Sequence, residues 1–142
     1  MTFTTQAQVR FAHVDGAGIV FYPRYFEMLN GAVEDWFESL GCPFNSMHRQ
    51  RQMGVPTVKL ECEFLAPSEL GDVLTIRIEP TRLGQSSCTL NYSVSANGTE
   101  RLRASGVLVC MNTALKKSMP WPEDLRPRMR AAIGIVERPT LF

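Results

Sequence analysis

The sequence lacks any long apolar run and has almost no excess of charge. No stretch approaches the ~20 apolar residues of a membrane-spanning helix, and residues 1–10 are polar and alternating, without the apolar block of a signal peptide. The 15 basic and 14 acidic residues give a net charge of +1, which provides no overall attraction to nucleic acid or to an anionic membrane. We therefore expect a cytoplasmic protein in which any anionic partner is held by local charge.

The chain has only two histidines, and its four cysteines lie far apart in the sequence. The four cysteines form no CxxC pair, and neither histidine lies at ligand spacing from them, which argues against a structural zinc site. No metal or other cofactor is therefore expected. Disulfides are disfavoured in a cytosolic setting, and a free cysteine in a strand is usually a small buried apolar residue. The cysteines in strand-like stretches are Cys62, Cys88 and Cys110.

What the chain does contain is enough apolar sequence for one core. It has 142 residues, of which 44% are hydrophobic and 20% are charged, so neither disorder nor low complexity fits. This length is typical of a single domain, and no internal repeat is present. We expect one domain over residues 1–142.

One segment has the spacing of a long amphipathic helix. Apolar residues from Phe26 to Leu40 recur at intervals of three and four, with polar residues on the other faces. Pro23 suits the first turn of a helix, because its missing N–H would have no intrahelical partner there. Gly41 follows where a left-handed C-terminal cap is expected, and Pro43 blocks continuation.

Strand-like alternation precedes and follows this helix. We expect an N-terminal strand over Phe3–Phe11, and the four later strands are Val55–Phe64, Val73–Thr81, Ser86–Ser95 and Arg101–Met111. The short turn-like segments between them predict an antiparallel meander. The fold class is therefore α+β, with a curved five-stranded antiparallel sheet wrapped around one helix. Residues 45–54 are expected as a helical turn or connection, and residues from about 113 as a tail with one short helix.

Asp15 lies in a Gly-rich turn that leads into the predicted helix, which begins near Tyr22. Backbone N–H groups at a helix start have no intrahelical partner and lie at the positive end of the helix dipole. Such donors stabilise the oxyanion that forms when an acyl carbonyl is attacked, and a carboxylate nearby can activate water or attack directly. Asp before Gly is also a common turn pair, so the spacing alone fits either role.

A longer pattern surrounds this turn in Phe11–Phe26. It comprises an Asp, two residues, a Gly, two apolar residues, an aromatic residue, a Tyr and a second Tyr three positions later. The pattern resembles the signature of the 4-hydroxybenzoyl-CoA thioesterase family of hotdog-fold proteins. The resemblance is specific over Val9 to Gly41, and the order of helix and strands fits the hotdog plan through about Asn112.

The resemblance implies an acyl-CoA thioesterase that releases a free acid and CoA. It implies that Asp15 is the catalytic carboxylate, as nucleophile or general base, and that the backbone N–H of Tyr22 polarises the thioester carbonyl. Gly18 and Tyr25 belong to the same signature and are expected at the substrate, and the Tyr25 hydroxyl needs a partner if it is buried. The resemblance also implies paired subunits with the site between them, as a dimer or as a tetramer built from two dimers.

Two positions depart from the 4-hydroxybenzoyl members. Asn30 stands where those proteins have an acidic residue at the phenol end of the pocket, and Leu83 stands where they have a Trp. We therefore expect an aryl or medium-chain acyl group, without strong preference for a 4-hydroxyl.

The phosphates of CoA need a local basic cluster. The candidates are Arg82, Arg126, Arg128 and Arg130.

Two other functions are compatible with the residues. A hydratase of enoyl thioesters on the same fold would need a His and Asp pair, for which only His13 is placed; His48 is expected at the surface. A non-catalytic acyl-CoA binding protein would keep the pocket without needing Asp15. Release of free thiol from a panel of acyl-CoAs separates the three functions. The sequence is also compatible with a thioester of acyl carrier protein as the substrate, in place of a thioester of CoA.

Overall fold

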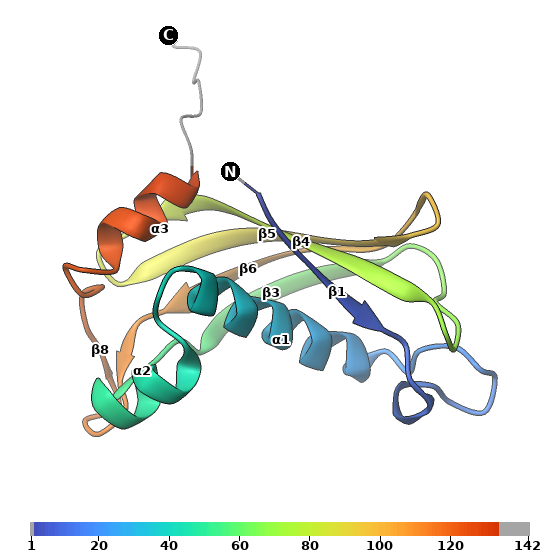
Figure 1. Cartoon of the computed structure of the whole chain (residues 1–142), viewed down its shortest axis with the longest axis horizontal. Coiled ribbons are helices and arrows are strands. Elements are labelled where there is room, and N and C mark those ends of the chain that lie inside the picture. The colour runs from blue at the N-terminus through green and yellow to red at the C-terminus, as the bar shows by residue number, and fades with distance from the viewer. Residues whose placement is uncertain (1, 134–142) are drawn as a thin grey trace, which may run out of the picture.

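Residues 2–133 are described by the computed structural model of the chain, shown in Figure 1. Within them, a five-stranded antiparallel sheet curves around one long helix, as the sequence predicts, and a three-stranded sheet lies beside it. The helices are α1 (Pro23–Ser39), α2 (Phe44–Gln50) and α3 (Arg126–Ile133), with a 3-10 turn, η1 (Phe11–His13). The large sheet contains β1 (Phe3–Gln8), β3 (Thr57–Phe64), β4 (Val73–Leu83), β5 (Ser87–Ala96) and β6 (Thr99–Val109). The small sheet contains β2 (Met53–Gly54), β7 (Met111–Asn112) and β8 (Lys117–Ser118). No described helix is long and apolar enough to cross a membrane.

The strands of the large sheet follow the order β1-β4-β5-β6-β3. The predicted meander is correct for β4, β5 and β6, but β3 pairs with β6 instead of with β4. β1 pairs with β4 at the opposite edge. Because β5 and β6 separate β3 from β4, residues 65–72 are not a hairpin turn. They form a connection across the end of the sheet, beside the start of α1 (Figure 1).

The apolar stripe of α1 packs against the concave face of the sheet. Its buried residues are Tyr25, Met28, Leu29, Ala32, Val33, Trp36 and Phe37. Alternate residues of the strands bury their side chains toward the helix, as Leu74 and Ile76 do on β4. The helix ends where the sequence predicts, since Gly41 has a φ of +82°, which an L side chain rarely adopts.

The first strand ends at Gln8, earlier than the predicted Phe11. Val9 is buried, but the chain then turns into η1, and the side chain of Phe11 is 82% exposed. The turn is stabilised locally, because the His13 N–H donates to the carbonyl oxygen of Arg10 at 2.9 Å and the His13 Nδ1 accepts the Arg10 N–H at 2.8 Å. These bonds replace the sheet pairing that the apolar alternation predicted.

The expected C-terminal tail is instead part of the core over the described residues. The buried residues there are Trp121, Leu125 and Met129. Their spacing of four residues is the pattern in the sequence that indicates a buried apolar face. The predicted short helix corresponds to α3. Arg128 on this helix donates a hydrogen bond of 2.8 Å to the carbonyl oxygen of Leu40, at the end of α1.

The cysteines are free thiols, and most of them are apolar core residues. Cys42, Cys88 and Cys110 are buried, whereas Cys62 is half-buried. Burial raises the pKa of the Cys88 thiol to about 12 and that of Cys110 to about 11. Both therefore stay protonated and unreactive at neutral pH.

Candidate active site

Residues 15–19 form a tight turn that presents Asp15 at the surface. The Asp15 N–H donates to the carbonyl oxygen of Ile19, and the Gly18 N–H donates to that of Asp15, both at 3.0 Å. Gly18 has a φ of +80°, a conformation that favours glycine. The Oδ1 atom of Asp15 accepts the Ala17 N–H at 2.9 Å, whereas Oδ2 has no partner among the described residues. The carboxylate thus keeps one oxygen free for a substrate or for water.

The backbone N–H of Tyr22 lies at the start of α1 and has no hydrogen-bond partner within residues 2–133. Tyr22 has helical backbone angles, with φ −53° and ψ −36°, and Pro23 after it has no N–H. The preceding N–H, of Phe21, donates to the carbonyl oxygen of His13 at 2.9 Å, which holds the helix start against the Asp15 turn. The free N–H is therefore at the positive end of a 17-residue helix.

The hydroxyl of Tyr25 has the partner that the sequence analysis required. It donates a hydrogen bond of 2.8 Å to the Oγ atom of Ser68. Tyr25 is 4% exposed and Ser68 is fully buried. Sequence reasoning missed Ser68 because it lies in residues 65–72, which have the composition of an ordinary turn.

A small apolar slot of about 270 Å³ adjoins Tyr22. Its lining residues are Ile19, Val20, Tyr22, Tyr25, Phe64, Leu65, Ala66 and Pro67. The rings of Tyr22 and Phe64 meet edge to face, with 5.9 Å between their centroids. None of the lining side chains is charged, so the slot suits an apolar or aryl acyl group. Phe64, at the end of β3, was not singled out from the sequence, because nothing local places a strand end beside the helix start.

Asn30, Arg82 and Leu83, which the sequence suggested for substrate binding, do not line the slot of their own chain. Tyr22, Phe26 and Asn30 are spaced four apart and share one face of the helix, and Asn30 is exposed. Arg82 and Leu83 end β4, a strand of 11 residues that starts beside the slot, so they lie roughly 30 Å away. Arg82 is exposed and Leu83 packs partly against the core.

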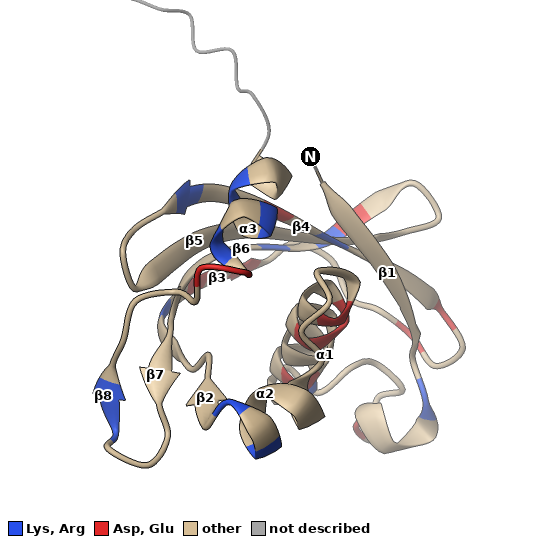
Figure 2. Cartoon of the chain, turned by 60° about the vertical axis from the view of Figure 1, so that its left-hand side comes forward, with Lys and Arg blue, Asp and Glu red and all other residues tan. Residues whose placement is uncertain are grey.

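The other basic candidates also lie at the far end of α1. Figure 2 shows basic residues on α2, β8 and α3, and acidic residues along α1. Arg126 donates to the carbonyl oxygen of Gly84 at 3.0 Å, and Arg128 donates to that of Leu40, where its charge complements the helix dipole. Arg130 is exposed. Within one chain, the structure does not bring these side chains to Asp15.

The two histidines have different surroundings. His13 is near Asp15 in sequence, but its Nδ1 atom accepts the Arg10 N–H and cannot act as a base while that bond is made. His48 is exposed on α2, as expected, and its ring meets that of Phe44 at 5.9 Å. Residues 2–133 contain no group of three or more His, Cys, Asp or Glu side chains that could hold a metal ion.

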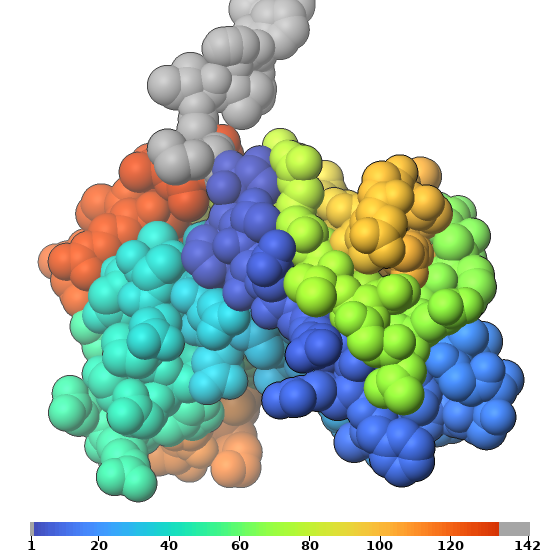
Figure 3. All heavy atoms as spheres, turned by 45° about the vertical axis from the view of Figure 1, so that its right-hand side comes forward, coloured from blue at the N-terminus to red at the C-terminus, as the bar shows by residue number. Residues whose placement is uncertain are grey.

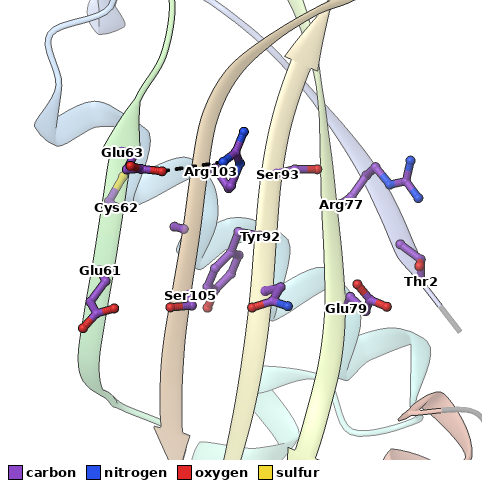
Figure 4. Close-up of a pocket in the computed structure, with 12 residues that line it drawn as sticks. Thr2, Glu61, Cys62, Glu63, Arg77, Glu79, Tyr92, Ser93, Arg103 and Ser105 are labelled. Atoms are coloured by element: carbon purple, nitrogen blue, oxygen red, sulfur yellow. Dashed lines mark ion pairs between the residues drawn. The ribbon is translucent and has the colours of Figure 1, made fainter. Parts of the chain in front are cut away.

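A larger hollow of about 600 Å³ lies on the other face of the sheet, away from α1 (Figure 4). Its lining includes several charged side chains, and Arg103 there forms ion pairs with Glu63 at 3.7 Å and with Glu100 at 3.0 Å. Strands alone form this hollow, so it has no helix start to stabilise an oxyanion. The smaller slot is the candidate active site, because it is lined by Tyr22, whose N–H is free, and by Ile19, at the end of the Asp15 turn (Figure 3 shows this end of the molecule).

Comparison with known proteins identifies the family of the chain. The thioesterase-like superfamily matches residues 9–129 of the chain. The 1,4-dihydroxy-2-naphthoyl-CoA hydrolase of Synechocystis sp. is 28% identical over 124 residues, covering 86% of this chain and 90% of that protein. The hydrolase of the same name from Synechococcus sp. is 33% identical over 105 residues, covering 70% of this chain and 69% of that protein.

Solved structures of thioesterases share the fold. A gentisyl-coenzyme A thioesterase has a TM-score of 0.82 at 27% identity, with 89% of this chain and 99% of that chain covered. A variant of 4-hydroxybenzoyl CoA thioesterase, complexed with 4-hydroxybenzoyl CoA, has a TM-score of 0.83 at 25% identity, with 90% and 98% covered. The expected hotdog fold is confirmed. The chain belongs to the thioesterase-like superfamily.

Proposed function

We propose that the protein hydrolyses acyl-CoA thioesters with aryl or medium-chain acyl groups to the free acid and CoA. Two observations carry this proposal. The Asp15 carboxylate has one free oxygen, and it belongs to the turn that the hydrogen bond from Phe21 to His13 holds to the helix start. At that helix start the backbone N–H of Tyr22 has no partner among the described residues. The thioester carbonyl would accept a hydrogen bond from that N–H, which stabilises the negative charge on the oxygen as the carbonyl is attacked.

Two chemical routes fit this arrangement. In the first, Asp15 takes a proton from a water molecule that adds to the carbonyl carbon; the C–S bond then breaks and the CoA thiolate takes up the proton. In the second, the free Oδ2 of Asp15 attacks the carbonyl carbon, the C–S bond breaks, and water hydrolyses the resulting anhydride. Both routes use the same carboxylate and the same oxyanion donor.

The lining of the slot supports an aryl substrate. Uncharged aromatic and aliphatic side chains surround it, among them Tyr22, Tyr25 and Phe64. The named relatives also act on aryl thioesters of CoA, namely 1,4-dihydroxy-2-naphthoyl-CoA, gentisyl-coenzyme A and 4-hydroxybenzoyl CoA. A flat ring can stack against such aromatic walls, whereas nothing in the slot pairs with a charged acyl group.

A second copy of the chain would complete the slot on its open side. β3 is an edge strand, and its side chains Val58, Leu60 and Phe64 are exposed although apolar. An unpaired edge with an apolar face is a surface that pairing covers. Antiparallel pairing of β3 with its symmetry mate would bury these residues and bring the partner's chain against Tyr22 and Asn30.

Release of free thiol from a panel of acyl-CoAs tests the function. The panel contains benzoyl-CoA, 4-hydroxybenzoyl-CoA, octanoyl-CoA and crotonyl-CoA, and thiol is followed with a disulfide reagent. We expect turnover on the aryl or medium-chain members. Binding without thiol release would instead favour an acyl-CoA binding protein, and consumption of crotonyl-CoA with the thioester intact would favour a hydratase.

A further inference from the structure

The segment Pro67–Asp72, here called the bracing segment, makes backbone contacts with the Asp15 turn. The Val20 N–H donates to the carbonyl oxygen of Ser68 at 2.9 Å, and the Leu70 N–H donates to that of Gly18 at 3.3 Å. Ile19 and Glu69 form an antiparallel bridge between these bonds. The turn is thus held by the backbone of residues 68–70.

The same segment contacts the start of α1 through one side-chain pair. The Tyr25 hydroxyl, on the first turn of the helix, donates to Ser68 Oγ at 2.8 Å. Since both residues are buried, loss of either hydroxyl leaves the other without its partner. Ser68 therefore links the turn, through its carbonyl group, to the helix, through its hydroxyl group.

Arg101 fixes the bracing segment from the body of the sheet. Its guanidinium donates to the carbonyl oxygen of Pro67 at 3.1 Å and to the carboxylate of Asp72 at 2.8 Å. A third bond of 3.1 Å goes to the carbonyl oxygen of Ala96, at the end of β5. Arg101 is buried, so both ends of the segment are tied to the sheet through a planar group with little freedom.

We propose that the bracing segment sets the position of the Asp15 carboxylate relative to the Tyr22 N–H, with Ser68 and Tyr25 as positioning residues and Arg101 as their anchor. The proposal rests on the hydrolase function proposed above. Neither hydroxyl of the pair needs to touch the reacting atoms. Their effect arises because a small displacement between an attacking group and its oxyanion donor lowers the rate strongly.

Tyr25→Phe, Ser68→Ala and the double variant test this with steady-state kinetics on the best acyl-CoA. We expect kcat to fall about 10-fold in each single variant, while KM changes less than about 3-fold, because positioning acts on the transition state. The double variant should be within about 3-fold of either single variant, since all three lack the same bond. Thr5→Val is the matched control: it removes the 2.9 Å bond from Thr5 to Asp35, also on α1, and should keep wild-type kcat.

The Ser68→Ala variant distinguishes a positioning role from a loss of substrate contact, because Tyr25 lines the slot and Ser68 does not. Wild-type kcat in folded Ser68→Ala would overturn the proposal, even if Tyr25→Phe were slow. Folding is checked by thermal unfolding, and turnover is expressed per folded molecule.

Hydrogen exchange provides a readout that does not depend on activity. The Val20 N–H donates to Ser68 and the Leu70 N–H donates to Gly18, so both amides report the contact between the turn and the bracing segment. In both single variants we expect these two amides to exchange about 10-fold faster. The amide of Leu40, at the far end of α1, should exchange as in the wild type. Unchanged exchange at Val20 and Leu70 would refute the proposal. If the wild-type protein released no thiol from any acyl-CoA, the proposed hydrolase function would fail, and exchange would still decide whether the segment braces the turn.

Discussion

The indole ring of Trp121 stacks on the ring of Phe37, with 6.1 Å between the centroids and 24° between the planes. Its Nε1–H donates to the carbonyl oxygen of Ser87 at 3.0 Å. The chain that follows the small sheet is thus joined to α1 and to β5 at once. The segment around Trp121 completes the core at the end of the molecule opposite the candidate active site.

Trp121→Ala should therefore destabilise the protein by about 3–5 kcal/mol, because it leaves a cavity against Phe37 and removes the hydrogen bond to Ser87. Urea unfolding followed by circular dichroism measures the change. Leu115→Ala is the control, since Leu115 is 67% exposed and its loss should cost less than about 0.5 kcal/mol. Equal stability of the two variants would contradict the core assignment.

Asp15→Asn should keep the fold and lower turnover by at least about 100-fold, because the amide has the shape of the carboxylate but neither its basicity nor its nucleophilicity. Thiol release measures turnover, and thermal unfolding confirms the fold. Asp35→Asn, at an exposed position of α1, is the matched control and should keep wild-type turnover. Near-normal turnover of Asp15→Asn on the best substrate would show that Asp15 is not the catalytic carboxylate.

The preference for a 4-hydroxyl on a benzoyl group should be small. Asn30 carries no charge to pair with a phenol, and the lining of the slot is apolar. A site built to hydrogen-bond a hydroxyl rejects the analogue without it by orders of magnitude, whereas an apolar slot gains little from each added group. The ratio of kcat/KM for 4-hydroxybenzoyl-CoA and benzoyl-CoA measures this. A ratio above about 1,000 would show that the slot is misassigned while leaving the hydrolase function in place.

Stability should fall in acid partly through Asp72. The backbone N–H of Glu69 and the guanidinium of Arg101 hold the pKa of the Asp72 carboxyl below its usual value. Its contribution is therefore fully present above the unfolded pKa of about 4 and is lost as the pH falls through the lower folded pKa. Asp72→Asn should lower the unfolding free energy at neutral pH and flatten its decline below about pH 4.

Urea unfolding at several pH values tests this expectation. Asp124→Asn is the comparison, because Arg51 lowers the pKa of Asp124 as well, but that side chain is 54% exposed. Solvent screening should make its effect the smaller of the two. An acid decline in Asp72→Asn as steep as in the wild type would contradict the role of the Asp72 carboxylate.

Leu60→Lys should dissociate the proposed assembly and reduce turnover, because it places a charge in the apolar face of the β3 edge. Sedimentation velocity measures the mass, and thiol release measures the activity. Val73→Lys is the control: Val73 is exposed and apolar too, but it lies on β4, an inner strand of the sheet. A wild-type protein that sediments as a monomer would contradict the pairing.

The parts of the structure that depend on local sequence were predictable. The spacing of apolar residues predicted α1, and Gly41 marked its end because the left-handed cap depends on one residue. The turn at Asp15 and the free N–H of Tyr22 lie close together in sequence, so the motif found both. The carboxylate and the N–H that we propose as the oxyanion donor therefore belong to one local segment of the chain.

Contacts between distant residues were not predictable in this way. Pairing of β3 with β6 depends on which edge of the sheet is open, and a turn-like sequence between β3 and β4 does not encode that choice. Ser68 and Arg101 were missed for the same reason, since their partners Tyr25 and Asp72 lie 43 and 29 positions away. In the sequence, Ser68 reads as an ordinary turn residue and Arg101 as an ordinary strand residue. Only the assembled sheet brings each of them to its partner.

The strand order β1-β4-β5-β6-β3 also has a consequence for the sequence of events in folding. β5 and β6 are joined by a tight turn at Asn97 and Gly98, so the central hairpins close short loops and can form early. β1 and β3 pair only with strands far along the chain, and such contacts form more slowly. The candidate active site contains the chain that follows β1 and the end of β3. Recovery of turnover during refolding should therefore lag behind recovery of the circular dichroism signal, and enzyme activity would report the last stage of folding.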